Sequence, residues 1–165
     1  IEHDPHPDSL AFTLLDFSEP TLDYTRSCIS RVSQQTGKTV NVEFVNESVH
    51  QLLKRATKRE ETLSSNVFDF VYCAGLFDYL SDKVCSRLLQ YFVARTRPGG
   101  CVMVTNVHAS NPQKVVMEHL LEWHLIYRDE AGLEAVLPEL RQNTRLFTDE
   151  TGANIFAEFW VPETA

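Results

Sequence analysis

Residues 67–80, VFDFVYCAGLFDYL, constrain the fold of this chain more than any other stretch. A short apolar run at 68–72 opens into three small residues at 73–75, and Ser81 then offers an N-cap for a following helix. A strand, a glycine-bearing loop and a helix form half of a βαβ unit, and open parallel sheets bind ligands beside such loops. The stretch therefore predicts the floor of an active site, with a plain buried strand and a tight exit as the alternative.

The rest of the chain alternates short apolar runs with helical patterns in the same way. We expect strands, each of the first four followed by a helix, at 10–15, 40–45, 68–72, 101–105, 144–148 and 154–161. Ser18 and Gly37 mark the two ends of the first helix, and Ser48 begins the second. Continuously apolar strands indicate a sheet that is buried on both faces. The predicted fold class is therefore α/β, with a mostly parallel sheet and a C-terminal antiparallel hairpin.

Charge and composition exclude several classes of protein. The net charge of −8 disfavours nucleic acid and anionic membranes as partners. No run approaches 18 apolar residues, so we expect no stable membrane insertion. The first residues lack the pattern of a signal peptide, and the four cysteines show no CxxC spacing, which favours a cytoplasmic protein with reduced thiols. The six histidines form no ligand pair, so no metal site is expected.

Three local patterns together resemble the class I S-adenosylmethionine-dependent methyltransferases. They are the acid-ended strand LLD at 14–16, the strand FDFV at 68–71 with its loop, and RPGG at 97–100 before the next strand. The finer texture of 74–80, AGLFDYL, and 122–128, EWHLIYR, is similar to bacterial proteins labelled as 3-hydroxypalmitate methyl ester biosynthesis proteins. The resemblance covers 10–161 and implies a Rossmann-like sheet, S-adenosylmethionine as cofactor, and methyl transfer to a small-molecule or fatty-acid acceptor.

The resemblance also implies a set of cofactor-binding residues. Asp16 would accept hydrogen bonds from the ribose diol, unless it caps the helix that begins after Ser18. Phe17 would pack on the adenine or in the core, and Glu47 and Ser48 would lie near the adenine amino group, with Glu47 as a solvated charge the alternative. Small residues at the strand exit would let the backbone approach the methionine end: Cys73, Ala74 and Gly75.

The predicted catalytic residues are Asp78, Tyr79 and His108, which would face the transferred methyl group and the acceptor. A hydroxyl or amine acceptor would need a general base, for which His108 or Asp78 are the candidates, whereas a carboxylate acceptor would need none. The alternatives are a helix cap for Asp78, a surface aromatic for Tyr79 and a structural role for His108. Asn106 and Asn111 accompany His108 in the expected exit loop and would point to the same edge.

The segment 113–128 is expected to hold a long helix with apolar residues at 115, 116, 120 and 121, followed by an aromatic stretch. Trp123, Tyr127 and Arg128 would either close an acceptor pocket, with Arg128 pairing a substrate carboxylate, or simply pack between helices. A second helix is expected from about Asp129.

The chain departs from the methyltransferase pattern at its start. The glycine-rich first strand and turn have no counterpart, since the six glycines form no GxG, and 1–9 is interpreted as a linker. We therefore expect 10–165 to be an incomplete methyltransferase-like domain, the C-terminal portion of a longer enzyme; the alternative is a non-catalytic Rossmann-like domain used for dimerisation or regulation. With the central strand absent, we expect 10–15 and 68–72 to pair directly or a homodimer to form.

Overall fold

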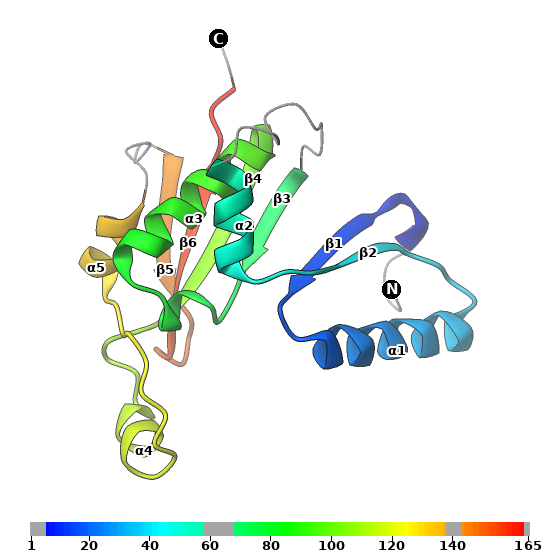
Figure 1. Ribbon diagram of the computed structural model, residues 1–165. Helices are drawn as coiled ribbons and strands as arrows, with labels where there is room; N and C mark the ends of the chain where they lie inside the picture. Colours follow the sequence, from blue (N-terminus) through cyan, green and yellow to red (C-terminus); the bar gives the residue numbers. More distant parts are fainter. Residues whose placement is uncertain (1–5, 58–67, 138–142, 164–165) are drawn as a thin grey trace. The chain divides into compact units, whose positions relative to one another are not determined.

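The computed structural model describes residues 6–57, 68–137 and 143–163 (Figure 1). The chain divides into two compact units, Ile1–Thr62 and Leu63–Ala165, and each unit holds a sheet of its own. Among the described residues, no helix has the length and apolar character needed to cross a bilayer.

The first unit is a βαβ arrangement with a further helix. Its elements are η1 (Pro7–Ser9), β1 (Ala11–Asp16), α1 (Glu19–Thr36), β2 (Asn41–Asn46) and α2 (Val49–Thr57). β1 and β2 pair in parallel, with Ala11 opposite Asn41 and Asp16 opposite Asn46. The Ser18 side chain accepts a hydrogen bond from the Thr21 N–H at the start of α1, and Gly37, at φ 68°, ends the helix. Both helix boundaries are therefore as predicted.

The second unit carries a four-stranded mixed sheet. Its elements are β3 (Phe68–Cys73), η2 (Phe77–Tyr79), α3 (Asp82–Arg95), β4 (Thr96–Val107), α4 (Lys114–His119), α5 (Glu130–Val136), β5 (Thr144–Thr148) and β6 (Asn154–Trp160). The strand order is β3-β4-β6-β5, with β3 and β4 parallel and β6 antiparallel to both of its neighbours. The predicted α/β class with a C-terminal antiparallel hairpin is confirmed.

One face of this sheet forms the core of the second unit. Along β6, Ile155, Ala157 and Phe159 are buried and alternate with more exposed residues, as a period of two requires. α3 and α5 pack on this face (Figure 1) and are joined by a hydrogen bond of 3.1 Å from the Ser86 hydroxyl to the Val136 carbonyl. The helices also contribute side chains to this core, and four of them are fully buried: Leu88, Leu89, Leu133 and Val136.

The first and third strands, which were expected to pair directly, lie in different units, so this pairing stays a prediction. Within the described residues of each unit, β1 pairs with β2, and β3 pairs with β4. Each of the two strands thus takes a partner from the next βα unit along the chain. The expected homodimer stays a prediction.

The Pro-Gly-Gly sequence was expected as a turn before a strand, but it lies inside the longer strand β4. Phe68 is opposite Thr96 and Phe70 is opposite Cys101, so β4 bulges by several residues against β3. A Cβ on Gly100 would lie 2.6 Å from Thr96 Cγ2 and 2.9 Å from the Asp69 carbonyl oxygen. The second glycine is therefore required because the two strands approach closely at the bulge.

The long helix expected after residue 112 is also wrong, since α4 has only six residues. Its C-terminal end is followed by Glu122, which has a positive φ of 52°, and the chain then runs extended to α5. The apolar residues that were expected to bury one face of a long helix, Val115, Val116, Leu120 and Leu121, are exposed.

Candidate functional site

The candidate site of the second unit lies at the edge of the sheet where β3 and β4 end. The two strands are parallel, with Cys73 opposite Val104, so the loops that follow them leave the same edge. Gly75 has a φ of 69°, and its N–H donates to the Thr105 hydroxyl at 3.2 Å. No atom lies within 4 Å of the place where a Gly75 Cβ would be, so a ligand can approach the backbone of this exposed loop.

Asp78 joins the two loops from η2. Its side chain is buried, and Oδ1 accepts a hydrogen bond of 2.5 Å from the Val107 N–H, while its carbonyl accepts one of 2.7 Å from the Ile126 N–H. Burial raises the pKa of this carboxyl, against the opposing effects of the Val107 N–H and the Arg128 charge. The geometry gives Asp78 a clear structural function, and a catalytic role for it stays a prediction.

Tyr79 follows Asp78 and faces solvent. Its side chain is 54% exposed, and its hydroxyl accepts a hydrogen bond of 2.9 Å from the Trp123 indole N–H. An aromatic pair therefore lies in the open, between η2 and the extended segment after α4. Such a pair can cover an apolar acceptor, since both rings keep exposed surface.

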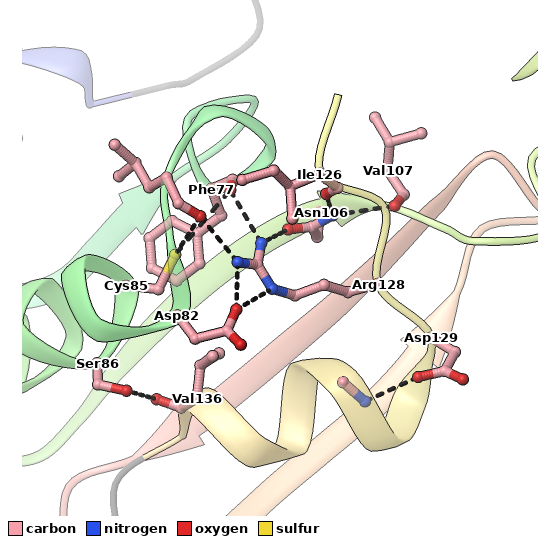
Figure 2. A network of polar contacts seen from close by, with 12 residues as sticks. Phe77, Asp82, Cys85, Ser86, Asn106, Val107, Ile126, Arg128, Asp129 and Val136 are labelled. Carbon is pink, nitrogen blue, oxygen red and sulfur yellow. Dashed lines mark hydrogen bonds and ion pairs between the residues drawn. The ribbon is translucent and has the colours of Figure 1, made fainter. Parts of the chain in front are cut away.

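Arg128 is the centre of a buried polar network (Figure 2). Its Nη1 donates to the Asn106 side chain at 2.6 Å and to the Phe77 carbonyl at 2.9 Å, and its Nη2 donates to Asp82 at 2.6 Å and to the Leu80 carbonyl at 2.8 Å. The guanidinium is thereby occupied by the protein itself. The packing alternative holds for Arg128, and pairing with a substrate carboxylate is not supported.

The two asparagines near His108 are likewise engaged inside the protein. Asn106 lies within β4 and is fully buried; beside its bond from Arg128, its amide donates to the Ile126 carbonyl at 2.9 Å. The Asn111 side chain accepts from the Gln113 N–H at 2.7 Å and donates weakly to Met117. The expectation that both amides point to a ligand fails, because the connection from β4 to α5 uses them to satisfy its own buried polar groups.

His108 directly follows β4 at the same edge as Asp78. Its Nδ1 lies 2.6 Å from the Ser110 hydroxyl, and its Nε2 lies 3.3 Å from Glu130 Oε2. The imidazole is mostly buried, with 12% of its side chain exposed, whereas Glu130 is 61% exposed. An imidazole placed between a hydroxyl and a carboxylate is suited to proton transfer.

Cys73, at the end of β3, is a partly buried thiol whose environment disfavours the reactive thiolate. Burial raises its pKa to about 12, and burial likewise raises the pKa of Cys85 to about 11. All four cysteines are free. At this position Cys73 contributes a small apolar side chain.

The predicted adenosine-binding residues all lie in the first unit. Asp16 ends β1, and its Oδ1 accepts a hydrogen bond of 2.8 Å from the Ser18 N–H, so the carboxylate takes part in the helix start. The N–H of the partly buried Glu47 donates to the Asp16 carbonyl at 3.1 Å. Phe17 is 76% exposed, which rules out the core as its place in this unit.

Ser48 is used locally as the N-cap of α2. Its hydroxyl and its N–H both lie 2.8 Å from Gln51 Oε1, and the Gln51 N–H is 3.3 Å from the Ser48 hydroxyl. This reciprocal arrangement is a capping box. An adenine contact for Ser48 stays a prediction.

Sequence reasoning missed three residues that the structure places at or near the site: Ser110, Asp82 and Glu130. Asp82 directly follows the expected N-cap Ser81, and its carboxylate accepts a hydrogen bond from the buried Arg128. Glu130 is the first residue of α5 and follows the N-cap Asp129. The Asp129 side chain caps the helix by accepting a hydrogen bond of 2.8 Å from the Gly132 N–H. The cap could have been recognised from the Asp-x-x-Gly spacing, but nothing in the sequence links Glu130 to His108, 22 residues earlier.

Comparisons with known proteins find the fold and no family. No protein-family description matches this sequence, and no curated protein matches it. Among solved structures, a possible exported protein from Bordetella parapertussis superposes with a TM-score of 0.67 at 15% identity, over 92% of this chain and 53% of that one. The chain therefore spans about half the length of that protein.

Two of the similar structures are methyltransferases. The N-methyltransferase NodS from Bradyrhizobium japonicum WM9, in complex with S-adenosyl-L-homocysteine, matches with a TM-score of 0.53 and 14% identity over 93% of this chain and 67% of that one. Magnesium protoporphyrin IX methyltransferase (ChlM) from Synechocystis PCC 6803 with bound S-adenosylhomocysteine matches with a TM-score of 0.58 and 9% identity. The match covers 92% of this chain and 64% of that one. The chain thus shares its fold with these methyltransferase structures.

Proposed function

We propose that this chain is part of an S-adenosylmethionine-dependent methyltransferase that acts on a small-molecule or fatty-acid acceptor. The observation that carries the proposal is the strand order β3-β4-β6-β5, in which the last strand enters antiparallel between its neighbours, together with the likeness to structures that hold S-adenosylhomocysteine. S-adenosylmethionine, when bound, supplies an electrophilic methyl group, so the protein has mainly to align the acceptor and remove its proton.

Features of both units, taken one unit at a time, fit such a cofactor. In the first unit, Asp16 ends a parallel strand with a carboxylate that the Ser18 N–H holds in place, as a ribose diol requires. In the second unit, the loop at Gly75 leaves open space beside its backbone, which suits the methionine part. Asp16, Phe17, Glu47 and Ser48 would bind the adenosine part, and Cys73, Ala74 and Gly75 the methionine part.

Calorimetric titration of the protein at its full natural length with S-adenosylhomocysteine tests this proposal. We expect binding, and we expect Asp16→Asn to weaken it by about 5- to 150-fold, the range for one or two hydrogen bonds to a charged group. Asp23→Asn is the matched control, because Asp23 is an exposed carboxylate on α1 that pairs with the neighbouring Arg26. Absence of binding to a folded protein would refute the proposal.

A non-catalytic Rossmann-like domain used for dimerisation or regulation is the second candidate. It is favoured by the absence of any GxG turn from the sequence. This candidate predicts a folded protein that does not bind S-adenosylhomocysteine and whose oligomeric state is unaffected by it. The same titration, followed by light scattering with and without the ligand, separates the two functions.

A further inference from the structure

The proposed function gives no joint role to a row of three hydrogen-bonded side chains, Ser110, His108 and Glu130. The three side chains come from the exit of β4 and from the first turn of α5, and they lie in series at 2.6 Å and 3.3 Å. Ser110 is exposed, His108 is mostly buried behind it, and the carboxylate lies on the far side of the ring. The row therefore joins an exposed hydroxyl to an exposed carboxylate through one mostly buried imidazole.

The hydrogen bonds fix the tautomer of His108. The Ser110 backbone N–H donates to Nδ1 at 3.2 Å, and a backbone N–H can only donate. Nδ1 is therefore the unprotonated acceptor nitrogen, and the ring proton lies on Nε2, where it is donated to Glu130. The Ser110 hydroxyl also donates to Nδ1, which leaves its oxygen lone pairs directed away from the ring.

The backbone around the row is held on both sides. The His108 N–H donates to the Ala153 carbonyl at 2.9 Å, and His108 and Arg128 form a parallel bridge in which the Arg128 N–H donates to Val107 at 3.2 Å. The Arg128 side chain is itself locked by the network of Figure 2. Glu130 follows two residues later, so the buried guanidinium fixes the segment that carries the carboxylate.

A serine beside a histidine and an acid also suggests acyl transfer, but the backbone here argues against it. The N–H groups of Ala109, Ser110 and Asn111 all donate within the loop, to Arg128, to His108 Nδ1 and to the His108 carbonyl. None of them is left to stabilise an oxyanion, which is the main requirement of that chemistry. The row is better suited to accept a proton.

We propose that Ser110, His108 and Glu130 form a proton relay for a hydroxyl acceptor. This inference rests on the proposed function and narrows its acceptor. As the acceptor oxygen forms its bond to the methyl group, its proton passes to Ser110 Oγ, and the Ser110 proton passes to His108 Nδ1. The resulting imidazolium is stabilised by Glu130. Ser110 touches the acceptor, His108 holds the proton, and Glu130 is a positioning residue.

The acidity of the acceptor indicates the kind of hydroxyl. A phenol has an ordinary pKa of about 10, so its proton can pass to a neighbouring base as the methyl group is transferred. An aliphatic alcohol is a much weaker acid, and a carboxylate has no proton to give at neutral pH. The relay therefore fits a phenol or another acidic hydroxyl.

Nitrogen-15 spectra of the histidine rings test the relay without any turnover. We expect a single His108 tautomer with the proton on Nε2, and a shift of the Nδ1 resonance when 4-methylphenol is added to the S-adenosylhomocysteine-saturated protein. Ser110→Ala should abolish that shift, and 4-methylbenzoate should not produce it. A proton on Nδ1, the same shift with both probes, or no shift with either would overturn the proposal.

Transfer of a labelled methyl group to 4-methylphenol is the second measurement. We expect His108→Gln and Ser110→Ala to lower kcat by about 10²- to 10⁴-fold, the range for general base catalysis, with KM little changed. Glu130→Gln should lower kcat less, and Glu130→Asp should recover part of it; Glu134→Gln, an exposed carboxylate one turn later on α5, is the matched control. Full kcat in His108→Gln, or no transfer to the phenol by a protein that binds S-adenosylhomocysteine, would refute the relay.

The two proposals fail in different ways. If S-adenosylhomocysteine does not bind, the proposed methyltransferase function is wrong, whereas the ring spectra with 4-methylphenol alone still judge the tautomer and the contact with Ser110. If the cofactor product binds and only the phenol effects are missing, the relay is wrong and the methyltransferase function stands.

Discussion

The buried carboxyl of Asp78 links two loops through a single short bond to the Val107 N–H. Removing that acceptor leaves a buried N–H without a partner, so Asp78→Ala should lower the free energy of unfolding by about 1–3 kcal/mol. Asp78→Asn keeps an oxygen in place and should cost much less. Urea unfolding monitored by circular dichroism measures both variants, and equal losses in the two would contradict this account.

The pH dependence of the same residue has a defined sign. Because burial raises the pKa of Asp78, the folded state holds this proton to higher pH than the unfolded state does. The contribution to stability is complete below the ordinary value of 3.8 and is lost as the pH rises through the raised folded value. Asp78→Asn, which does not titrate, should therefore gain stability relative to the natural protein as the pH rises above 3.8. A stability difference that shifts in favour of the natural protein with rising pH would contradict this account.

The thiols of Cys73 and Cys85 should be inert while the protein is folded. With a pKa of about 12, Cys73 is ionised in about one molecule in ten thousand at pH 8, against about one in ten at the ordinary value of 9.0. Alkylation by iodoacetamide, followed by mass spectrometry, should thus be roughly a thousandfold slower for Cys73 in the folded protein than in guanidinium. Similar rates in the two states would show that β3 opens readily.

At the scale of elements, Arg128 ties η2, the start of α3 and β4 to the segment before α5. Arg128→Ala leaves the Asn106 side chain and two carbonyls without their donor, and we expect a loss of about 3 kcal/mol, a large part of a typical total of roughly 5–15 kcal/mol. Arg97→Ala is the matched control: Arg97 pairs with Asp69 on the surface and should cost about 0.5 kcal/mol or less. Equal midpoints in urea for the two variants would contradict a role for the network.

The elements whose ends depend on local chemistry were predictable from the sequence. Ser18 and Gly37 bound α1, and Asp129 begins α5, because caps act over three or four residues. The bulge at Gly100 and the shortness of α4 were not predictable, since the first depends on the approach of β3 and the second on a chain reversal at Glu122. The same division applies to the candidate site: Asp78 and His108 were found as polar residues after apolar strands, while Glu130 became visible only through its distance to His108.

At the scale of the whole molecule, each unit has a parallel strand at the edge of its sheet, β1 in the first unit and β3 in the second. Among the described residues of its own unit, β1 pairs on one side only, and so does β3, whose Phe70 and Tyr72 rings stack at 6.2 Å and are more than half exposed. We expect the 165-residue chain to self-associate in a concentration-dependent way, measured by size-exclusion chromatography with light scattering. The double variant Phe70→Lys/Tyr72→Lys should reduce association.

Leu120→Lys provides the control for this last prediction. Leu120 is 75% exposed, more than either ring, and it follows α4 instead of lying in β3. If Leu120→Lys reduces association as much as the β3 variant does, the association is non-specific contact between exposed apolar side chains. A monomer at all concentrations would refute the prediction.

The place of β6 has a consequence for how the protein is made. Residues 154–160 leave the ribosome after both β4 and β5, yet they pair between these two strands. Until they emerge, β5 has no partner and the apolar residues of β4 lack one of their two neighbours. The nascent second unit therefore cannot complete the β4-β6-β5 part of its sheet before β6 is synthesised, and a ribosome stalled before residue 154 would present quality-control factors with an incomplete sheet.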